Sequence, residues 1–397
     1  MKKPWERAPL DEAVFLQEGP GIRSYEYQKG GYPMINVRCV QDGYIDLSTC
    51  NAANVELATG KWKHFQVQEG DILFTISGSI GRTAVVKKKD LPLLMNTSVV
   101  RFRSKTTRLR DDFFFYYLQS EDFLGKLHAL SSGTAQKNVG PTHLKTLDVP
   151  LPPLAEQQRI VGLLDEAFEG LATAKANAEK NLQNARALFE SHLQSVFTQR
   201  GEGWQTKTLF ETCDVVNGGT PKTGVPEYWD GKHRWITPAE MGKRLNPYVS
   251  ETERMISDLG LRNSSAQMLP PHSVILSSRA PIGYLVINTE PMATNQGCKG
   301  LIPGGHLHHK FLYYYLSSIV DLLNSLGTGA TFKELSGGKL KEVPVVVAPL
   351  LEQQQIVAKL DDLREETQRL ARLYERKHAL LTALKKSLLH QAFTGEL

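Results

Sequence analysis

The stretch "PLAEQQRIV" (Pro153–Val161) returns almost unchanged as "PLLEQQQIV" (Pro349–Val357). The match holds without a gap at an offset of 196 residues and carries Phe197 onto Phe393. A long ungapped match indicates a rigid element, because loops tolerate insertions and helices do not. We therefore predict two equivalent helices, each beginning at the repeated stretch.

The segments that precede these helices also repeat, but more loosely. "GDILFTISGSIG" from Gly70 resembles "HSVILSSRAPIG" from His272, and "FFYYL" from Phe114 resembles "LYYYL" from Leu312. The offset drifts between 196 and 202 residues, which places insertions and deletions inside these segments. The sequence thus predicts two related globular modules with different loops. The expected domains are a first module (1–152), a central helix (153–200), a second module (201–348) and a distal helix (349–397).

Both helices carry apolar residues at alternating steps of three and four, the heptad of a coiled-coil seam. In the second copy the seam includes Leu360, Leu384 and Leu388, with Thr367 and Lys377 as imperfect members. A helix of this length spans on the order of 65 Å and cannot bury a full seam alone. We expect the helices to form an antiparallel coiled coil, with the modules at its opposite ends and related by a pseudo-two-fold axis. The alternative is that each helix packs only on its own module.

Short β-branched segments such as "DILFTI" and "SVILSS" predict strands. "DDFFFYYLQSEDFLGKLHAL" and "HKFLYYYLSSIVDLLNSL" predict amphipathic helices whose aromatic residues belong to a core rather than to a base-stacking surface. The expected fold class is α+β for each module.

Composition sets broad limits. The 397 residues include 47 basic and 42 acidic side chains, and this net charge of +5 permits nucleic-acid binding without demanding it. The four cysteines form no C-x-x-C pair, so we expect small buried hydrophobic side chains in a reducing cytoplasm. No apolar stretch reaches the roughly 20 residues that span a bilayer, and the first residues do not resemble a secretory signal.

Known catalytic motifs are not found. No phosphate-binding glycine loop, H-E-x-x-H or G-x-S-x-G is present in the sequence. "NPYV" at Asn246 has only one of the two prolines typical of adenine methyltransferases, and "GGHLHHK" at Gly304 is better explained as a loop before a helix than as a metal site. We predict a binding protein that holds no metal or cofactor itself.

Candidate DNA contacts are loop residues with hydrogen-bond donors near glycines, together with one basic stretch, "RFRSKTTRLR" from Arg101. The loop "NGGTPKTGVPEYWDG" from Asn217 and the paired strand ends "SGSIGR" and "SSRAPIG" supply most of them. For any one of them, a solvated surface role or, for Arg279, a pair with an acid is an equal alternative. The candidates are Ser77, Ser79, Arg82, Arg101, Arg103, Lys137, Thr220, Lys222, Thr223, Tyr228, Trp229, Arg279 and Lys333.

Taken together, these motifs resemble the specificity subunit of type I restriction–modification systems. The resemblance rests on the repeated Pro-Leu-x-Glu-Gln-Gln before each helix, on "GGTP…PEYW" in the second module, on the paired "IG" strand ends and on the terminal "QAFTGEL". It covers essentially the whole chain. The first module departs from this pattern, because it lacks a "GGTP…PEYW" equivalent.

The resemblance implies two target recognition domains that each read one half of a split, asymmetric DNA sequence. It also implies two docking places for adenine-N6 methyltransferase subunits at the helix heads, formed by Glu156, Gln157, Gln158, Glu352, Gln353 and Gln354. S-adenosylmethionine, ATP and Mg²⁺ are then expected on the methyltransferase and restriction subunits, in a bacterial or archaeal cytoplasm. The alternatives are a coiled-coil adaptor that binds only proteins and a self-sufficient DNA methyltransferase or nuclease.

Overall fold

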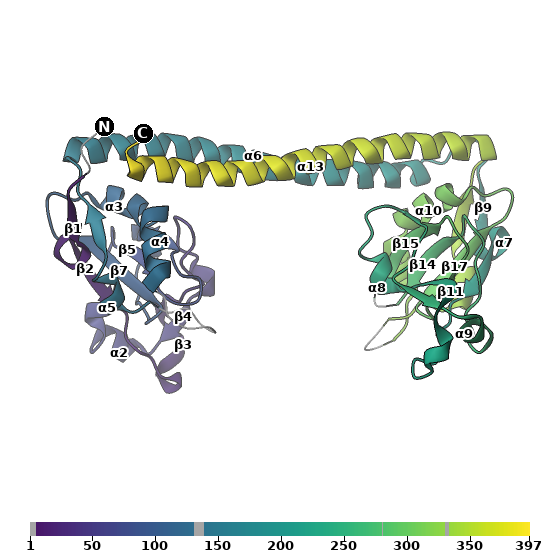
Figure 1. The fold of residues 1–397 in the computed structure, drawn as a ribbon, viewed down its shortest axis with the longest axis horizontal. Helices are drawn as coiled ribbons and strands as arrows, with labels where there is room; N and C mark the ends of the chain where they lie inside the picture. The colour runs from purple at the N-terminus through teal and green to yellow at the C-terminus, as the bar shows by residue number, and fades with distance from the viewer. Residues whose placement is uncertain (1–4, 131–138, 280, 330–332) are drawn as a thin grey trace. The chain divides into compact units, whose positions relative to one another are not determined.

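The computed structural model describes residues 5–130, 139–279, 281–329 and 333–397 (Figure 1). Two compact units make up the chain: Met1–Glu179 with Glu375–Leu397, and Lys180–Tyr374. Each unit contains one globular module and a part of both long helices. Within the described ranges, no helix is long and apolar enough to cross a lipid bilayer.

The first module is built on an antiparallel sheet in the order β2-β7-β5-β6. This module also contains two separate two-stranded sheets, one formed by β3 and β4 and the other by β1 and β8. The strands are β1 (Arg7–Pro9), β2 (Val14–Glu18), β3 (Tyr27–Met34), β4 (Asn51–Ala53), β5 (Ile72–Thr75), β6 (Thr83–Val85), β7 (Val99–Ser104) and β8 (Asp148–Pro150). The helices are α1 (Leu10–Ala13), α2 (Val55–Thr59), α3 (Asp111–Tyr117), α4 (Glu121–Leu130) and α5 (Pro141–Leu144).

The second module has a five-stranded sheet in the order β10-β17-β14-β15-β12, a three-stranded sheet β13-β11-β16 and the pair β18-β9. Its strands are β9 (Gln205–Thr208), β10 (Cys213–Asn217), β11 (Trp229–Ile236), β12 (Tyr248–Val249), β13 (Arg254–Ile256), β14 (Val274–Ser278), β15 (Ile282–Asn288), β16 (Met292–Thr294), β17 (Cys298–Pro303) and β18 (Pro344–Val347). Its helices are α7 (Leu209–Thr212), α8 (Pro238–Met241), α9 (Asp258–Arg262), α10 (His309–Ser318), α11 (Val320–Leu326) and α12 (Gly337–Lys341).

The main sheet of each module is buried on both faces. In β5, Ile72 and Phe74 join the core beneath α3 and α4, whereas Leu73 joins a separate core on the other face. In β14 of the second module, Leu276 joins one core and Ile275 joins a separate core on the other face of the sheet. Successive side chains of a strand point to opposite faces, so two covered faces require continuous apolar runs. This explains why "DILFTI" and "SVILSS" show no alternation of polar residues.

Both modules share a series of elements, into which the second module adds α8 and β12. The series β2, a short 3₁₀ turn at Ser24–Glu26, β3, β4 and α2 matches β10, a 3₁₀ turn at Pro226–Tyr228, β11, β13 and α9. The first module therefore has a structural counterpart of the "GGTP…PEYW" segment, although its sequence, "GPGIRSYEY" from Gly19, does not reveal it. The motif itself is absent from the first module, as the sequence indicates, while the fold supplies a counterpart of the segment.

Each repeated stretch begins a helix of 45 residues, α6 (Leu154–Thr198) and α13 (Leu350–Thr394). A proline stands directly before each helix, where no hydrogen-bonding N–H is lost. Gly395 follows α13 with φ +80, the left-handed conformation that ends many helices.

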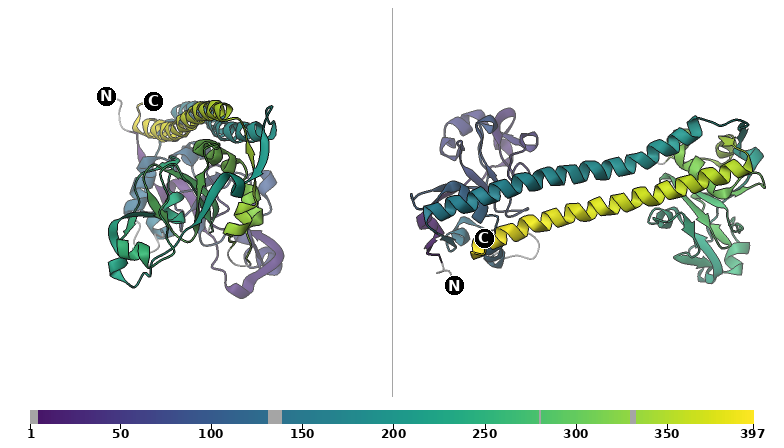
Figure 2. Two further views of the ribbon diagram at one scale, coloured as in Figure 1. Left: turned by 90° about the vertical axis from the view of Figure 1, so that its right-hand side faces the viewer. Right: turned by 90° about the horizontal axis from the view of Figure 1, so that it is seen from above.

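Within the first unit the start of α6 and the end of α13 run antiparallel. Arg159 Nη2 donates to the Leu397 carbonyl (2.9 Å), and further along α6 the Phe168 ring lies 5.1 Å from Lys385 Nζ. Ile160 and Leu164 share one core with Leu389 and Ala392, and the two segments lie side by side from the front and from above (Figures 1 and 2). In the second unit Leu193 and Phe197 of α6 share a core with Val357 and Leu360 of α13. The predicted antiparallel packing is confirmed within each unit.

The register of the seam in α13 differs from the prediction near its end. Leu384 is 47% exposed, while Lys385 is half-buried and lies over Phe168. A straight helix drifts by about 20° per heptad relative to a strict seven-residue repeat, so a seam counted from Leu360 slips by one position. Thr367, noted as an imperfect member, is nevertheless buried, and its hydroxyl donates to the Leu363 carbonyl (2.8 Å). The α+β class of both modules and their connection through two long coiled-coil helices agree with the prediction.

Candidate nucleic-acid interface

A hairpin with a fixed tip occurs in both modules. In the first, Thr75 Oγ1 donates to the Ser79 carbonyl (2.5 Å) and accepts from the Arg82 N–H (3.0 Å). In the second, Ser277 Oγ donates to the Pro281 carbonyl (2.8 Å) and accepts from the Tyr284 N–H (2.8 Å). One strand hydroxyl thus closes the β5–β6 tip and another closes the β14–β15 tip.

The residues on these tips differ. Gly81 and Gly283 occupy equivalent positions, with φ +96 and +113, where a side chain would be strained. The first tip presents Ser79 to solvent with Ser77 and Arg82 half-buried, whereas the second tip carries Arg279 and Tyr284 in the positions of Ser77 and Arg82. A shared backbone with different donors is the arrangement expected of two readers with different specificities.

A second repeated contact lies beside each hairpin. A Cβ atom added to Gly19 would lie 2.4 Å from the Asn96 carbonyl oxygen, and one added to Gly218 would lie 2.0 Å from that of Asn295. The Asn295 amide donates to Thr220 Oγ1 (2.9 Å) and accepts from the Gly297 N–H (2.8 Å). The loop after β10 is therefore fixed against the turn before β17.

We expect Gly218→Ala to lower the free energy of unfolding by about 2 kcal/mol, because backbone atoms must move to admit the methyl group. Gly224 lies in the same loop with no heavy atom within 4 Å of an added Cβ. Gly224→Ala is thus the matched control and should change stability by less than about 0.5 kcal/mol. Urea unfolding of both variants measures the difference, and equal stabilities would contradict the proposed contact.

In the second module two of the predicted residues, Arg279 and Lys333, lie near the same acidic residue, Glu334. Arg279 forms a β-bridge with Glu334, and its Nη1 lies 3.9 Å from Glu334 Oε2. Lys333 is exposed next to Glu334. Lys299 was not anticipated: it is only 7% exposed, and burial lowers the pKa of its amine. No sequence pattern singled out Lys299, and only the pairing of β14 with β17 places it beside this site.

The loop "TPKTGVPEYW" divides its residues between surface and core. Lys222 and Thr223 are exposed, and Tyr228 is half-buried. Trp229 packs edge-on against Trp235 with ring centroids 5.2 Å apart, and the Arg254 guanidinium carbon lies 3.7 Å from the centre of its ring. Trp229 therefore stabilises the loop, and its predicted contact with base edges is not supported by this position.

Two members of the predicted phosphate patch in the first module, Arg101 and Arg103, are directed into the module instead. Arg101 is 6% exposed and donates to the Gln66 carbonyl (2.6 Å) and the His64 carbonyl (2.8 Å). Arg103 Nη2 donates to the fully buried Asp71 (2.9 Å). The rest of the stretch also has protein partners: Lys105 with Asp11, Arg108 with Glu6, and Arg110 with Asp112. Lys137 lies outside the described residues.

The middle glutamine of each repeated helix head is a structural clamp. Gln157 is fully buried; its Oε1 accepts from the Arg110 N–H (2.9 Å), and its Nε2 donates to the carbonyls of Arg108 (2.7 Å) and Pro152 (2.8 Å). Gln353 makes the same set with the His308 N–H (2.8 Å) and the carbonyls of His306 (2.9 Å) and Ala348 (2.7 Å). The expectation that Gln157 and Gln353 dock a partner is wrong, because they are not accessible.

The other docking candidates remain at the surface. Gln158 and Gln354 are exposed. Glu156 is half-buried and pairs with Arg159 (2.7 Å), and Glu352 accepts from the Trp204 indole N–H (2.9 Å). The clamp therefore joins each helix to its module, while the neighbouring exposed side chains are available to a partner.

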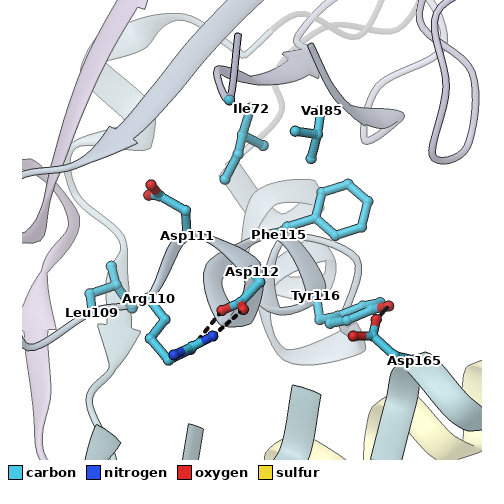
Figure 3. Close-up of a pocket in the computed structure, with 10 residues that line it drawn as sticks. Ile72, Val85, Leu109, Arg110, Asp111, Asp112, Phe115, Tyr116 and Asp165 are labelled. Atoms are coloured by element: carbon cyan, nitrogen blue, oxygen red, sulfur yellow. Dashed lines mark hydrogen bonds and ion pairs between the residues drawn. The ribbon is translucent and has the colours of Figure 1, made fainter. Parts of the chain in front are cut away.

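A cavity of about 640 Å³ lies where α3 meets α6 in the first unit (Figure 3). There the Tyr116 hydroxyl donates to Asp165 (2.5 Å), and burial raises the pKa of Tyr116. The second unit has the equivalent bond from Tyr314 to Asp361 (2.5 Å). The first cavity is lined by Arg110 together with Asp111, Asp112 and Asp165, and a cavity of about 460 Å³ in the second unit is lined by Lys310, Arg364 and Arg372 together with Asp361 and Glu365.

Two sequence features considered for catalysis have structural roles. Asn246 of "NPYV" closes a turn by accepting the Tyr248 N–H (3.0 Å). His309 begins α10, and His308 precedes it at the helix start, as predicted for a loop before a helix. Among the described residues, no group of three or more His, Cys, Asp or Glu side chains has the arrangement of a metal site.

Comparison with known proteins places these observations in a family. The family described as "Type I restriction modification DNA specificity domain" matches residues 2–182 and 201–375. The specificity subunit of the type I restriction enzyme MjaIX from Methanocaldococcus jannaschii is 35% identical over 44% of this chain and 41% of its own length. A putative type I restriction enzyme MjaX specificity subunit from the same organism is 24% identical over 99% of this chain and 93% of its own length.

The fold agrees with a solved structure as well. A chain from a structural study of complex assembly and conformational transition in a type I R-M system superposes with a TM-score of 0.80, at 21% identity, over 99% of this chain and 98% of that one. With the family matched once in each half, this chain belongs to the type I restriction–modification DNA specificity family and carries its domain twice.

Proposed function

We propose that this chain is the DNA-reading subunit of a type I restriction–modification complex and that its two modules read the two halves of a split, asymmetric target. The observation that carries the proposal is the pair of hairpins with one backbone design and different tips, Ser77 and Arg82 against Arg279 and Tyr284. A module that reads a few base pairs discriminates poorly in a genome, and a second module multiplies the discrimination.

The helix heads are the proposed docking places for two adenine methyltransferase subunits. Support comes from their duplication, and from the exposed Gln158 and Gln354 beside equivalent buried clamps. In this proposal the chain performs no catalysis. The methyltransferase subunits bring S-adenosylmethionine, a restriction subunit brings the ATP- and Mg²⁺-dependent chemistry, and the complex acts on cellular DNA in the cytoplasm.

The test maps adenine methylation on a DNA library by the chain purified with methyltransferase subunits from its neighbouring genes. We expect methylation at one bipartite sequence. The double variant Lys222→Ala, Arg279→Ala should alter one half-site only, because each lost base contact costs about 1–3 kcal/mol of discrimination. Lys359, exposed on α13 in the same unit, supplies the control Lys359→Ala, which should leave both half-sites unchanged.

Two outcomes of this experiment contradict the proposal. One is methylation without sequence preference. The other is a double variant that changes both half-sites together, since each module would then not read its own half.

A further inference from the structure

Two of the four cysteines lie together in the loop between β3 and β4. Cys39 is fully buried and Cys50 is partly exposed, and their sulfur atoms are 3.4 Å apart as free thiols. They are separated along the sequence without any recognisable motif. The expectation of small buried side chains holds for Cys39, Cys213 and Cys298, whereas Cys50 is partly exposed.

The backbone on both sides of the pair is held by hydrogen bonds. The Cys39 N–H donates to the Asn36 carbonyl (3.0 Å), and its carbonyl accepts from the Asp46 N–H (2.8 Å). The Cys50 N–H donates to the Leu47 carbonyl (3.2 Å). The Asn36 side chain crosses the loop to donate to the Thr49 carbonyl (2.8 Å). The approach of the two sulfurs is therefore part of the folded loop.

The surroundings favour a thiolate on one of the two sulfurs. The hydrogen bond from Cys50, with a further one from the Asn36 N–H (3.3 Å), lowers the pKa of Cys39 to about 6. The same contact raises the pKa of Cys50. The contact therefore favours thiolate on Cys39 and thiol on Cys50, so Cys39 can act as the base for Cys50, and thiolate is the reactive form in disulfide exchange.

We propose that Cys39 and Cys50 are a redox modification site that forms a reversible disulfide by exchange with a low-molecular-weight disulfide, for which oxidised glutathione is the probe. The sulfurs need to approach by little more than 1 Å to reach bonding distance, which is about 2.05 Å. The pair supplies an accessible sulfur for the first exchange and a buried partner for the second.

The exchange balances in two steps. The Cys39 thiolate takes the proton of Cys50 as the Cys50 sulfur attacks the small disulfide, breaking its S–S bond and releasing one small thiolate. That thiolate takes the proton from Cys39, whose sulfur then attacks Cys50 Sγ and displaces the second small thiolate. The two cysteines lose two electrons, and the small disulfide gains them.

The loop that would be cross-linked packs on the reading hairpin of its own module. The Gly43 N–H donates to the Thr83 carbonyl (2.9 Å) in β6, and a Cβ added to Gly78 would lie 3.7 Å from the Val37 side chain. A disulfide bond between Cys39 and Cys50 therefore restricts the motion of the loop that packs against the β5–β6 tip. The matching loop of the second module, residues 237–253, contains no cysteine, so the modification acts on one module only.

The other two cysteines provide an internal control. Burial raises the pKa of Cys213 to about 11 and that of Cys298 to about 12, and both side chains are buried. Neither is expected to react with a small disulfide in the folded chain.

The experiment treats the full chain with oxidised glutathione, blocks remaining thiols with an alkylating reagent after denaturation, and maps the peptides by mass spectrometry. We expect a linked pair of peptides containing Cys39 and Cys50, lighter by two hydrogen atoms than the reduced pair, with Cys213 and Cys298 alkylated. Dithiothreitol should restore both thiols. The oxidised chain should also show slower hydrogen exchange in residues 35–50.

Two variants distinguish the first exchange, at Cys50, from the second exchange, by Cys39. Cys39→Ser should leave a stable glutathione adduct on Cys50, because no second thiol is present to displace it. Cys50→Ser should leave Cys39 unmodified, because Cys39 is buried. In the unsubstituted chain, a persistent adduct on Cys50 with Cys39 still alkylatable would overturn the proposal, and so would disulfides formed only between different chains.

Discussion

Replacing Gln353 with leucine is expected to lower the free energy of unfolding of the second unit by on the order of 4 kcal/mol. Leucine has a similar volume but leaves three backbone groups without their partner, the His308 N–H and the carbonyls of His306 and Ala348. A buried polar group that loses its only partner costs about 1–3 kcal/mol. The measurement is urea unfolding followed by hydrogen exchange in the peptides of that unit.

Gln355→Leu is the matched control, since Gln355 is exposed two positions further along the same helix. It should change stability by less than about 0.5 kcal/mol. If both variants lose the same stability, added surface hydrophobicity and not the clamp explains the result. Gln157→Leu should reproduce the effect in the first unit, since Gln157 makes the same three bonds.

Arg101→Met is expected to destabilise the first unit by about 3–5 kcal/mol, the cost of removing one partner from a buried charged network. Asp71 is fully buried and would retain only Arg103 as a cationic partner, and the carbonyls of Gln66 and His64 would lose a donor. A phosphate contact would behave differently, because its loss reduces the salt dependence of DNA binding without unfolding the module.

Arg108→Met tests the same stretch at its surface. The side chains of Arg108 and Glu6 are 57% and 62% exposed, and pairs of this kind contribute less than about 1 kcal/mol. Thermal unfolding and DNA binding over a range of salt concentrations should therefore separate the two variants. An Arg101→Met chain that keeps its stability but binds DNA with a weaker salt dependence would restore the phosphate interpretation.

The sequence was sufficient for the large elements. Ungapped repetition from Pro153 and Pro349 located both long helices to within a residue of their starts. Runs such as "DILFTI" located the central strands, because hydrophobic patterning is a local property of the chain. The same patterning was less accurate for the coiled-coil seam. It predicts that Leu384 is buried, but the small angular drift of the helix exposes Leu384 and half-buries Lys385 instead.

Individual polar residues were harder to assign, because their partners are distant in the sequence. Arg101 looks like a surface charge until Asp71 is placed beside it by strand pairing. Gln157 and Gln353 look like surface side chains because they bond to backbone groups, which leave no signature in residue type. Cys39 and Cys50 meet only through the path of one loop. The burial and the bonding partners of each of these residues therefore depend on tertiary contacts, which sequence patterns do not reveal.

The duplicated glutamine clamp has a consequence for how such chains change over time. Each glutamine bonds only to main-chain atoms, so this part of the joint between module and helix does not depend on which side chains the module carries at the bonded positions. A recombination event that replaces residues up to Pro152 or Ala348 with a foreign module would preserve these backbone bonds, while the new module would still have to match contacts such as Tyr116 with Asp165 and Tyr314 with Asp361. The clamp thus lets a module be exchanged as one piece at its backbone connection to the helix.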